Sequence, residues 1–253
     1  MEARRRSLII TLDFFKFLTI FKISWVHLKL SQQKGADVRA LKASWTQQIF
    51  QLMKVEVKAS GQIFDFESVQ KLKRMQTPSE SIILVGNHTS YLDIPLVMNT
   101  EPSCCFVSKQ EVKYWPVIGK GAVKCETIFV QRESYKSRKN VRGQIIEALK
   151  NENKKLVIFP SGTTTLGPSA KWKKGAFEIA HQGKIKVQLF RVKYSPERPV
   201  AYIDNDFFPT HVMDLFKEPS IQAQIEFGES FYVQDVMQDL ARSKAWCETP
   251  FSV

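Results

Sequence analysis

The sequence is short of cysteine and histidine, and this limits the chemistry that it can support. Its 253 residues include only four cysteines and four histidines. Cys104 and Cys105 are adjacent, whereas Cys125 and Cys247 lie far from them and from each other. No CxxC pair and no Cys/His ligand spacing is present, so neither a disulfide framework nor a zinc site is indicated. We expect four free thiols in a reducing compartment.

The sequence also lacks an apolar run long enough to cross a bilayer. The longest apolar stretch, residues 8–30, follows three arginines as a signal peptide would, but no small-residue cleavage site comes after it. Asp13, Lys16 and Lys22 leave uncharged runs of about six residues, whereas a span needs about 20. We expect a helix in the bilayer interface, with basic side chains at the phosphates and aromatic ones toward the acyl chains. A helix buried against the protein body is the alternative, and a true span is favoured less.

Acidic residues are too few to balance the basic ones. Lys and Arg number 37 against 25 Asp and Glu, which gives a net charge of +12, and residues 1–60 hold 11 basic and 4 acidic residues. This excess indicates an anionic partner: nucleic acid, an acidic membrane surface or a phosphorylated substrate. We expect no nucleic acid, because no recognition module is readable and the N-terminal aromatic residues cluster with aliphatic ones.

Strands and helices alternate after about residue 53. A second helix is expected from Asp37, with apolar residues recurring at helical spacing to Leu52; they are core or face the first helix. Short apolar runs predict strands at 55–57 (an edge strand), 81–86, 104–107, 127–130, 156–159 and 186–194, and the clearest intervening helix covers 137–151. This alternation predicts an α/β sheet with helices on both faces and chemistry beyond the carboxyl ends of its strands.

A histidine and an aspartate follow the first buried strand. His88 comes two residues after Gly86, and Asp93 comes five residues after His88. That step does not place both side chains on one helix face, so the turn must be tighter than helical if they meet. A carboxylate on one imidazole nitrogen would fix the tautomer and leave the other nitrogen as a base. A capping histidine beside an unrelated carboxylate is equally compatible with the pattern.

Two further strand ends carry groups that suit an anion. Arg132 closely follows the strand predicted at 127–130 and would be aimed at the edge that holds His88. The basic residues at 136–142 are more simply a solvated helix face. Residues 159–165 form a hydroxyl-rich turn around Gly162. Its backbone N–H groups, with a lysine nearby, suit a phosphate or an oxyanion, although such a turn alone is not specific.

Taken in order, these segments resemble the glycerolipid acyltransferase superfamily over about residues 55–230. The blocks are NHTSYLDIP at 87–95, FVSKQEVKYWPVIGKGA at 106–122, IFVQR at 128–132, and FPSGTTTLG at 159–167 followed by WKKGAFEIA. The resemblance implies a mixed, mostly parallel sheet flanked by helices and preceded by a two-helix motif. It divides the chain into a membrane-interface motif (1–52), a catalytic domain (53–232) and a C-terminal helix and tail (233–253).

The resemblance further implies transfer of a fatty acyl group from acyl-CoA or acyl carrier protein to a lysophospholipid hydroxyl, without metal or cofactor. The preferred acceptor is 1-acyl-glycerol-3-phosphate, which gives phosphatidic acid. His88 would be the general base, oriented by Asp93. Residues implied in acceptor binding are Arg132, Ser161, Gly162, Thr163, Thr164 and Lys174. We expect a membrane-associated enzyme, peripheral or monotopic, on the cytoplasmic face; the sequence does not indicate an oligomeric state.

The sequence departs from the family pattern at three positions. Ser161 stands where the family has glutamate, Thr164 where lysophosphatidate enzymes often have arginine, and Leu189 where a proline is expected. The first two lie in the implied acceptor site. They leave open another lysolipid (lysophosphatidylethanolamine, lysophosphatidylcholine or lyso-ornithine lipid) and an inactive lipid-binding member of the fold.

Overall fold

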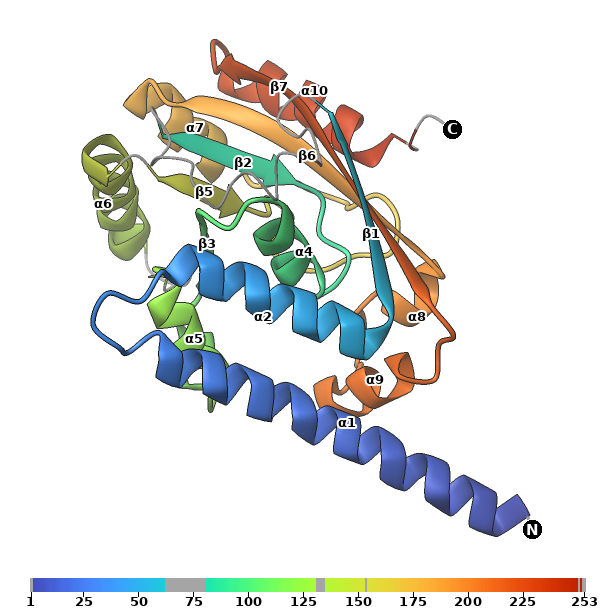
Figure 1. The fold of residues 1–253 in the computed structure, drawn as a ribbon. Helices are drawn as coiled ribbons and strands as arrows, with labels where there is room; N and C mark the ends of the chain where they lie inside the picture. The colour runs from blue at the N-terminus through green and yellow to red at the C-terminus, as the bar shows by residue number, and fades with distance from the viewer. Residues whose placement is uncertain (1, 62–80, 131–134, 153, 250, 252–253) are drawn as a thin grey trace.

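A seven-stranded sheet forms the centre of the protein in a computed structural model, which describes residues 2–61, 81–130, 135–152, 154–249 and 251 (Figure 1). The strand order is β1-β7-β6-β2-β5-β3-β4. The strands are β1 (Val55–Gly61), β2 (Ile82–Gly86), β3 (Cys104–Lys109), β4 (Ile128–Val130), β5 (Lys155–Ile158), β6 (Lys186–Ser195) and β7 (Ile221–Tyr232). All neighbours are parallel except β6 and β7, so the predicted mixed, mostly parallel sheet is confirmed.

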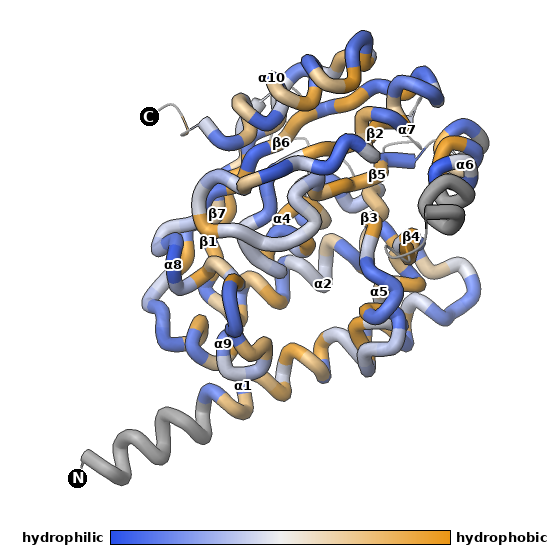
Figure 2. The backbone as a smooth tube through the Cα atoms, turned by 180° about the vertical axis from the view of Figure 1, so that it is seen from behind, coloured by the Kyte–Doolittle hydropathy of each residue, from blue (hydrophilic) through white to orange (hydrophobic). Residues whose placement is uncertain are grey.

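Helices cover both faces of this sheet, as expected. They are α1 (Glu2–Leu30), α2 (Val38–Met53), α4 (Asp93–Thr100), α5 (Ile118–Lys124), α6 (Tyr135–Glu152), α7 (Gly175–Gly183), α8 (Glu197–Val200), α9 (Phe208–Leu215) and α10 (Val236–Glu248), with a 3-10 helix η2 (Gln110–Tyr114). One apolar core joins α2, α4 and α9 to the sheet, and a second joins α6, α7 and α10 to its other face. Figure 2 shows hydrophobic residues concentrated on the central strands between these layers.

The longest strand, β7, was not expected from the sequence, although its pattern is clear. Ile221, Ala223, Ile225 and Phe227 are buried and alternate with more exposed polar residues, the period of a strand with one covered face. It pairs with β6 and, in parallel, with the edge strand β1, where Val55 is in register with Ile221. Because apolar and polar residues alternate along β7, the strand contains no continuous apolar run by which it could be recognised in the sequence.

The two N-terminal helices lie against each other, and α2 also lies against the edge strand β1. Asp37 caps α2 by accepting hydrogen bonds from two backbone N–H groups of its first turn. Ile49 and Phe50 of α2 are buried in the core, whereas half-buried Trp45 donates a hydrogen bond to the Ser24 hydroxyl on α1 (3.0 Å). The second helix therefore contacts both the core and α1, which are the two placements that its sequence left open.

Helix α1 is apolar on two sides, one buried and one exposed. Phe17, Ile20 and Ile23 pack on the core, next to α5 and α9. Five large apolar side chains between residues 14 and 26 are exposed on the other side: Phe14, Phe15, Leu18, Trp25 and Val26. Within the described residues, no helix is long and apolar enough to cross a membrane. The division at residues 52 and 232 stays a prediction.

Candidate active site

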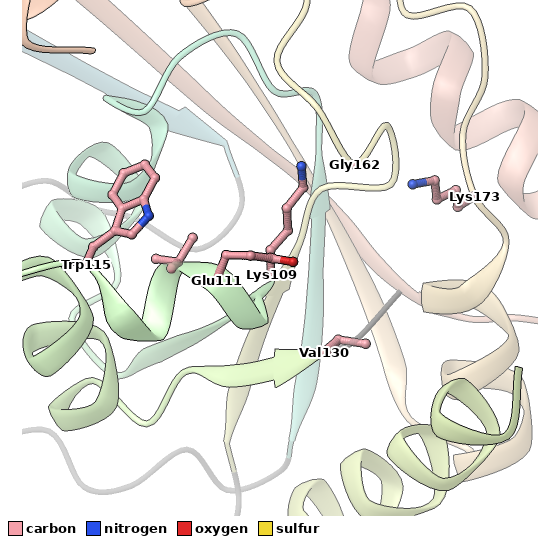
Figure 3. Close-up of a pocket in the computed structure, with 7 residues that line it drawn as sticks. Lys109, Glu111, Trp115, Val130, Gly162 and Lys173 are labelled. Carbon is pink, nitrogen blue, oxygen red and sulfur yellow. The ribbon is translucent and has the colours of Figure 1, made fainter. Parts of the chain in front are cut away.

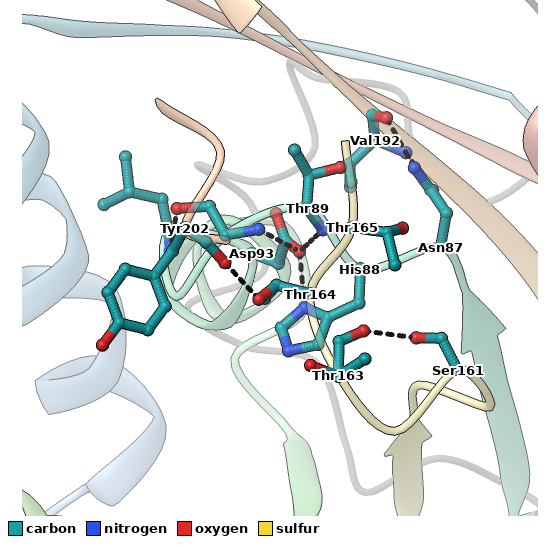
Figure 4. A network of polar contacts seen from close by, with 12 residues as sticks. Asn87, His88, Thr89, Asp93, Ser161, Thr163, Thr164, Thr165, Val192 and Tyr202 are labelled. Carbon is teal, nitrogen blue, oxygen red and sulfur yellow. Dashed lines mark hydrogen bonds and ion pairs between the residues drawn. The ribbon is translucent and has the colours of Figure 1, made fainter. Parts of the chain in front are cut away.

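His88 and Asp93 meet in a tight turn beyond the carboxyl end of β2. His88 Nδ1 lies 2.7 Å from Asp93 Oδ2, which also accepts hydrogen bonds from the Thr89 and Ser90 N–H groups (2.7 and 3.1 Å; Figure 4). A carboxylate only accepts hydrogen bonds, so Nδ1 carries the hydrogen of the neutral ring and Nε2 keeps its lone pair. The His88 side chain is 18% exposed, which leaves this nitrogen within reach of a substrate.

The Asn87 side chain fixes the His88 turn to strand β6 by making two hydrogen bonds of the kind that a backbone residue would make. The Asn87 side chain donates to the Val192 carbonyl (2.9 Å) and accepts from the Val192 N–H (2.8 Å), which continues the β2–β6 ladder past Gly86. The His88 ring stacks on Phe159, with centroids 4.0 Å apart and planes inclined by 14°. Two adjacent strand ends thus fix both the position and the tilt of the imidazole.

The hydroxyl-rich turn after β5 lies against the His88 turn. Thr165 N–H donates to the His88 carbonyl (2.8 Å), and the Ser161 hydroxyl donates to the Thr163 carbonyl (2.7 Å; Figure 4). Gly162 has a φ of +73°, a conformation that side chains disfavour. Among described residues, the N–H groups of Thr163 and Thr164 have no hydrogen-bond partner. The turn, which is bonded to the His88 carbonyl through Thr165, therefore offers two unpaired backbone donors.

An open cavity of about 510 Å³ adjoins this turn. It is lined by residues of η2, the ends of β3 and β4, and the turn: Lys109, Glu111, Val112, Trp115, Val130, Gly162 and Lys173. Figure 3 shows the amino groups of Lys109 and Lys173 approaching the Gly162 turn from two sides, with Glu111 on the wall. The cavity thus combines two cations, one carboxylate and an indole.

A model of the Acyltransferase family matches residues 65–193, which include the His88 turn, the cavity wall and the Gly162 turn. The chain belongs to the acyltransferase family. A lyso-ornithine lipid O-acyltransferase of Pseudomonas aeruginosa is 30% identical over 203 residues, which are 77% of this chain and 72% of that protein. The protein of the same name in Brucella abortus is 29% identical over 60% of this chain and 63% of its own length.

Other acyltransferases resemble shorter parts of the chain. A 1-acyl-sn-glycerol-3-phosphate acyltransferase of Neisseria gonorrhoeae is 30% identical over 117 residues, 46% of this chain and 45% of that protein. The chain thus covers less than two thirds of this and the Brucella protein. The crystal structure of the 1-acyl-sn-glycerophosphate acyltransferase PlsC from Thermotoga maritima superposes with a TM-score of 0.63 over 99% of both chains, at 16% identity, and shows that the fold is shared.

In this acyltransferase the structure gathers most of the residues that the sequence indicated. His88, Asp93 and the turn that contains Ser161, Gly162, Thr163 and Thr164 lie together. Lys174 is 60% exposed and pairs with Glu178 (3.1 Å) instead of lining the cavity. Arg132 lies outside the described residues, so its role stays a prediction. The described part holds no group of three or more His, Cys, Asp or Glu that could bind a metal ion.

Several residues of the site were not singled out from the sequence. Lys109 and Trp115 belong to a block that carries the family resemblance, and nothing in the local sequence marks Glu111 as a site residue. Tyr194 is buried and donates a hydrogen bond to Asp93 Oδ1 (2.7 Å). A signal existed for Tyr194, because a tyrosine inside an apolar strand needs a partner for its hydroxyl.

Proposed function

We propose that this acyltransferase moves a fatty acyl group from a thioester donor, acyl-CoA or acyl carrier protein, to the free hydroxyl of a lysolipid. The observation that carries the proposal is the 2.7 Å contact between His88 Nδ1 and Asp93, which leaves Nε2 as a proton acceptor beside a turn with two backbone donors. An imidazole suits this task because it changes protonation near neutral pH.

The reaction follows from this placement. His88 Nε2 takes the proton of the acceptor hydroxyl while the oxygen attacks the thioester carbonyl. The N–H groups of Thr163 and Thr164 are suited to hold the oxyanion of the tetrahedral intermediate. When the intermediate collapses, the C–S bond breaks and the thiolate takes the proton back from His88, while Asp93 balances the imidazolium charge in between.

The cavity beside Gly162 is the proposed site of the acceptor head group. Lys109 and Lys173 favour a phosphate there, which supports 1-acyl-glycerol-3-phosphate as acceptor and phosphatidic acid as product. Arg132, which follows the cavity residue Val130 in the chain, would add a third cation. In this scheme Ser161 shapes the turn through its bond to Thr163.

Two observations favour a zwitterionic acceptor as the second candidate. Glu111 lines the cavity, where it would repel a dianionic phosphate and pair with an ammonium group. The Thr164 hydroxyl donates to the Tyr202 carbonyl, so it offers no replacement for a phosphate-binding arginine. The similarity to lyso-ornithine lipid O-acyltransferases, at 30% identity over 77% of the chain, points in the same direction. An inactive lipid-binding role is the remaining alternative.

We further propose that the enzyme works at a membrane surface, on the cytoplasmic face. The exposed apolar side of α1 supports this, together with exposed Trp115 and Phe207 near α9. A lysolipid in the bilayer would then reach the cavity, whose wall includes Trp115, without leaving the interface.

A mass-spectrometric assay of the purified protein tests the function. It uses one acyl-CoA, and in parallel one acyl carrier protein, with lysophosphatidate, lyso-ornithine lipid, lysophosphatidylethanolamine and lysophosphatidylcholine. We expect an acylated product that His88→Ala abolishes and that Asp93→Asn reduces by roughly 10²-fold or more, because the imidazole loses its orientation and charge partner. Circular dichroism melts control for folding. A folded His88→Ala protein with near-normal turnover would contradict the proposed mechanism.

A further inference from the structure

The carboxylate of Asp93 is held by donors on both of its oxygens, and they come from different parts of the chain. Oδ2 accepts from His88 and from two N–H groups of the turn, whereas Oδ1 accepts from the Tyr194 hydroxyl at 2.7 Å. In the part of the chain that the structure describes, Tyr194 is the only partner of Oδ1. Asp93 and Tyr194 are 0% and 2% exposed, so water does not replace that partner.

Strand β6 places the Tyr194 hydroxyl beside Asp93. It pairs with β2 up to Phe190 opposite Gly86, and beyond that point it stays paired with β7 as far as Ser195 opposite Gln222. Phe190, Val192 and Tyr194 alternate along one face and are all buried in the same core as α4. Val192 anchors Asn87, and two residues further on Tyr194 reaches Asp93.

The Tyr194 hydroxyl stays protonated, so it always donates the hydrogen bond to Asp93. Burial, followed by the charge of Asp93, raises the pKa of its hydroxyl well above the ordinary value. The hydroxyl therefore keeps its proton at every pH at which the enzyme works. A hydrogen bond to a carboxylate disperses its negative charge and weakens its pull on a neighbouring imidazolium.

We propose that Tyr194 is a positioning residue, which sets the basicity of His88 by holding the second oxygen of Asp93. The inference deepens the proposed function, because it assumes that His88 is the base. Without the Tyr194 hydroxyl, Oδ1 is buried and unpaired and the carboxylate is more basic. It then stabilises the protonated ring of His88 more strongly, so His88 keeps its proton to higher pH.

The other ionisable and charged groups around the pair belong to separate contacts. Tyr91, in the same turn, donates to His211 Nδ1 (2.8 Å), because His211 Nε2 is the donor to the Ala201 carbonyl (3.1 Å). Lys109 and Lys173 line the cavity beside the Gly162 turn. Behind β6, the Cys247 thiol contacts the Phe190 carbonyl.

The test is a titration of the histidine ring signals by NMR, with the protein alone and no substrate. The chain has only four histidines, and His88→Ala assigns the signal of interest. We expect Tyr194→Phe to raise the titration midpoint of His88 by about 0.5 pH unit, and to leave that of His211 in place. The midpoint on the acidic side of the pH–rate profile should move up by the same amount. Turnover should fall about 10-fold, with an unchanged acceptor KM.

Tyr91→Phe is the matched control, because it removes the hydroxyl of a half-buried tyrosine from the same turn without touching Asp93. It should move the His211 signal and leave the midpoint of His88 in place. If Tyr194→Phe folds poorly, 3-fluorotyrosine at position 194 keeps the hydroxyl and makes it a stronger donor, and the His88 midpoint should then fall.

A His88 midpoint that stays in place or moves downward in folded Tyr194→Phe overturns the inference, as does an unmoved midpoint with fluorotyrosine. Because the titration needs no acyl transfer, this failure is distinct from failure of the proposed function. The latter would appear as normal transfer by folded His88→Ala.

Discussion

His88 and Asp93 are five residues apart because the turn between them is folded around the carboxylate. The N–H groups of Thr89 and Ser90 both point at Asp93 Oδ2, and the Asp93 N–H donates to the Ser90 carbonyl (3.1 Å). Asp93 then begins α4, where the helix dipole stabilises a negative charge. Backbone donors and the helix thus hold the carboxylate in place before any side chain contributes.

At the same scale, Glu111 should discriminate between acceptor head groups. We expect Glu111→Gln to raise kcat/KM for lysophosphatidate by about 2- to 5-fold, because a charge that repels phosphate is removed. For an acceptor that carries an ammonium group, kcat/KM should fall by a similar factor. The measurement is the kcat/KM ratio for lysophosphatidate and lyso-ornithine lipid.

Glu147→Gln, an exposed glutamate of α6 outside the cavity, is the control and should leave the ratio unchanged. Equal kcat/KM changes for both acceptors in Glu111→Gln would show that Glu111 does not face the head group.

Among the elements, α1 has an exposed apolar side, which includes Phe15, Leu18 and Trp25. Replacing Phe15, Leu18 and Trp25 together by alanine should weaken binding to anionic vesicles by about 10-fold or more, since each buries apolar surface in the interface. The melting temperature should barely change, because all three are exposed. Vesicle co-sedimentation at low and high salt measures the effect.

Met237→Ala on α10 is the matched control, because Met237 is 63% exposed but lies on a different helix. Point variants are preferable to deleting the helix, since Phe17 and Ile20 on its other side pack on the core. Unchanged vesicle binding by the triple variant would refute the interfacial orientation of α1.

The wall of the cavity depends on a close approach between α5 and η2. A Cβ atom on Gly119 would lie 2.2 Å from the Lys113 carbonyl oxygen, whereas one on Gly121 would meet nothing within 4 Å. Gly119→Ala should therefore destabilise the protein by roughly 1–3 kcal/mol and reduce turnover, because η2 carries Glu111. Gly121→Ala should do neither. Thermal melts and turnover assays of the two variants measure these effects. A Gly119→Ala protein with the melting temperature and turnover of the parent would show that the close contact is not needed.

The sequence predicts elements better than it predicts their neighbours. Strand β2 and the His88 turn are local patterns, and so both are readable without a structure. The parallel pairing of β1 with β7, by contrast, joins residues about 166 positions apart and leaves no local trace. Tyr194 and Glu111 belong to the second kind: each is ordinary in its own segment and gains a role only when β6 or η2 lies beside the site.

For the molecule as a whole, the four thiols are buried or, at Cys125, half-buried. Burial raises the pKa of Cys105 to about 11 and also raises the pKa values of Cys104, Cys125 and Cys247. Thiolates, not thiols, react with alkylating agents, so iodoacetamide at pH 8 should label the folded protein slowly and leave acyl transfer intact.

In guanidinium chloride all four cysteines should label, and mass spectrometry counts them. Rapid labelling of the folded protein, accompanied by loss of transfer, would instead point to a cysteine as an acyl carrier.

The pairing of the edge strand β1 with β7 also bears on how the chain is made. In the part of the sheet that the structure describes, β1 lies at the edge and pairs with β7, which begins at Ile221. A ribosome adding about 5–20 residues per second needs on the order of ten seconds or more to pass from one to the other. For much of that time α1 has left the ribosome without α9, one of the helices that its inner side packs against. The nascent N-terminal helices are thus available to a bilayer or a chaperone before the sheet is complete.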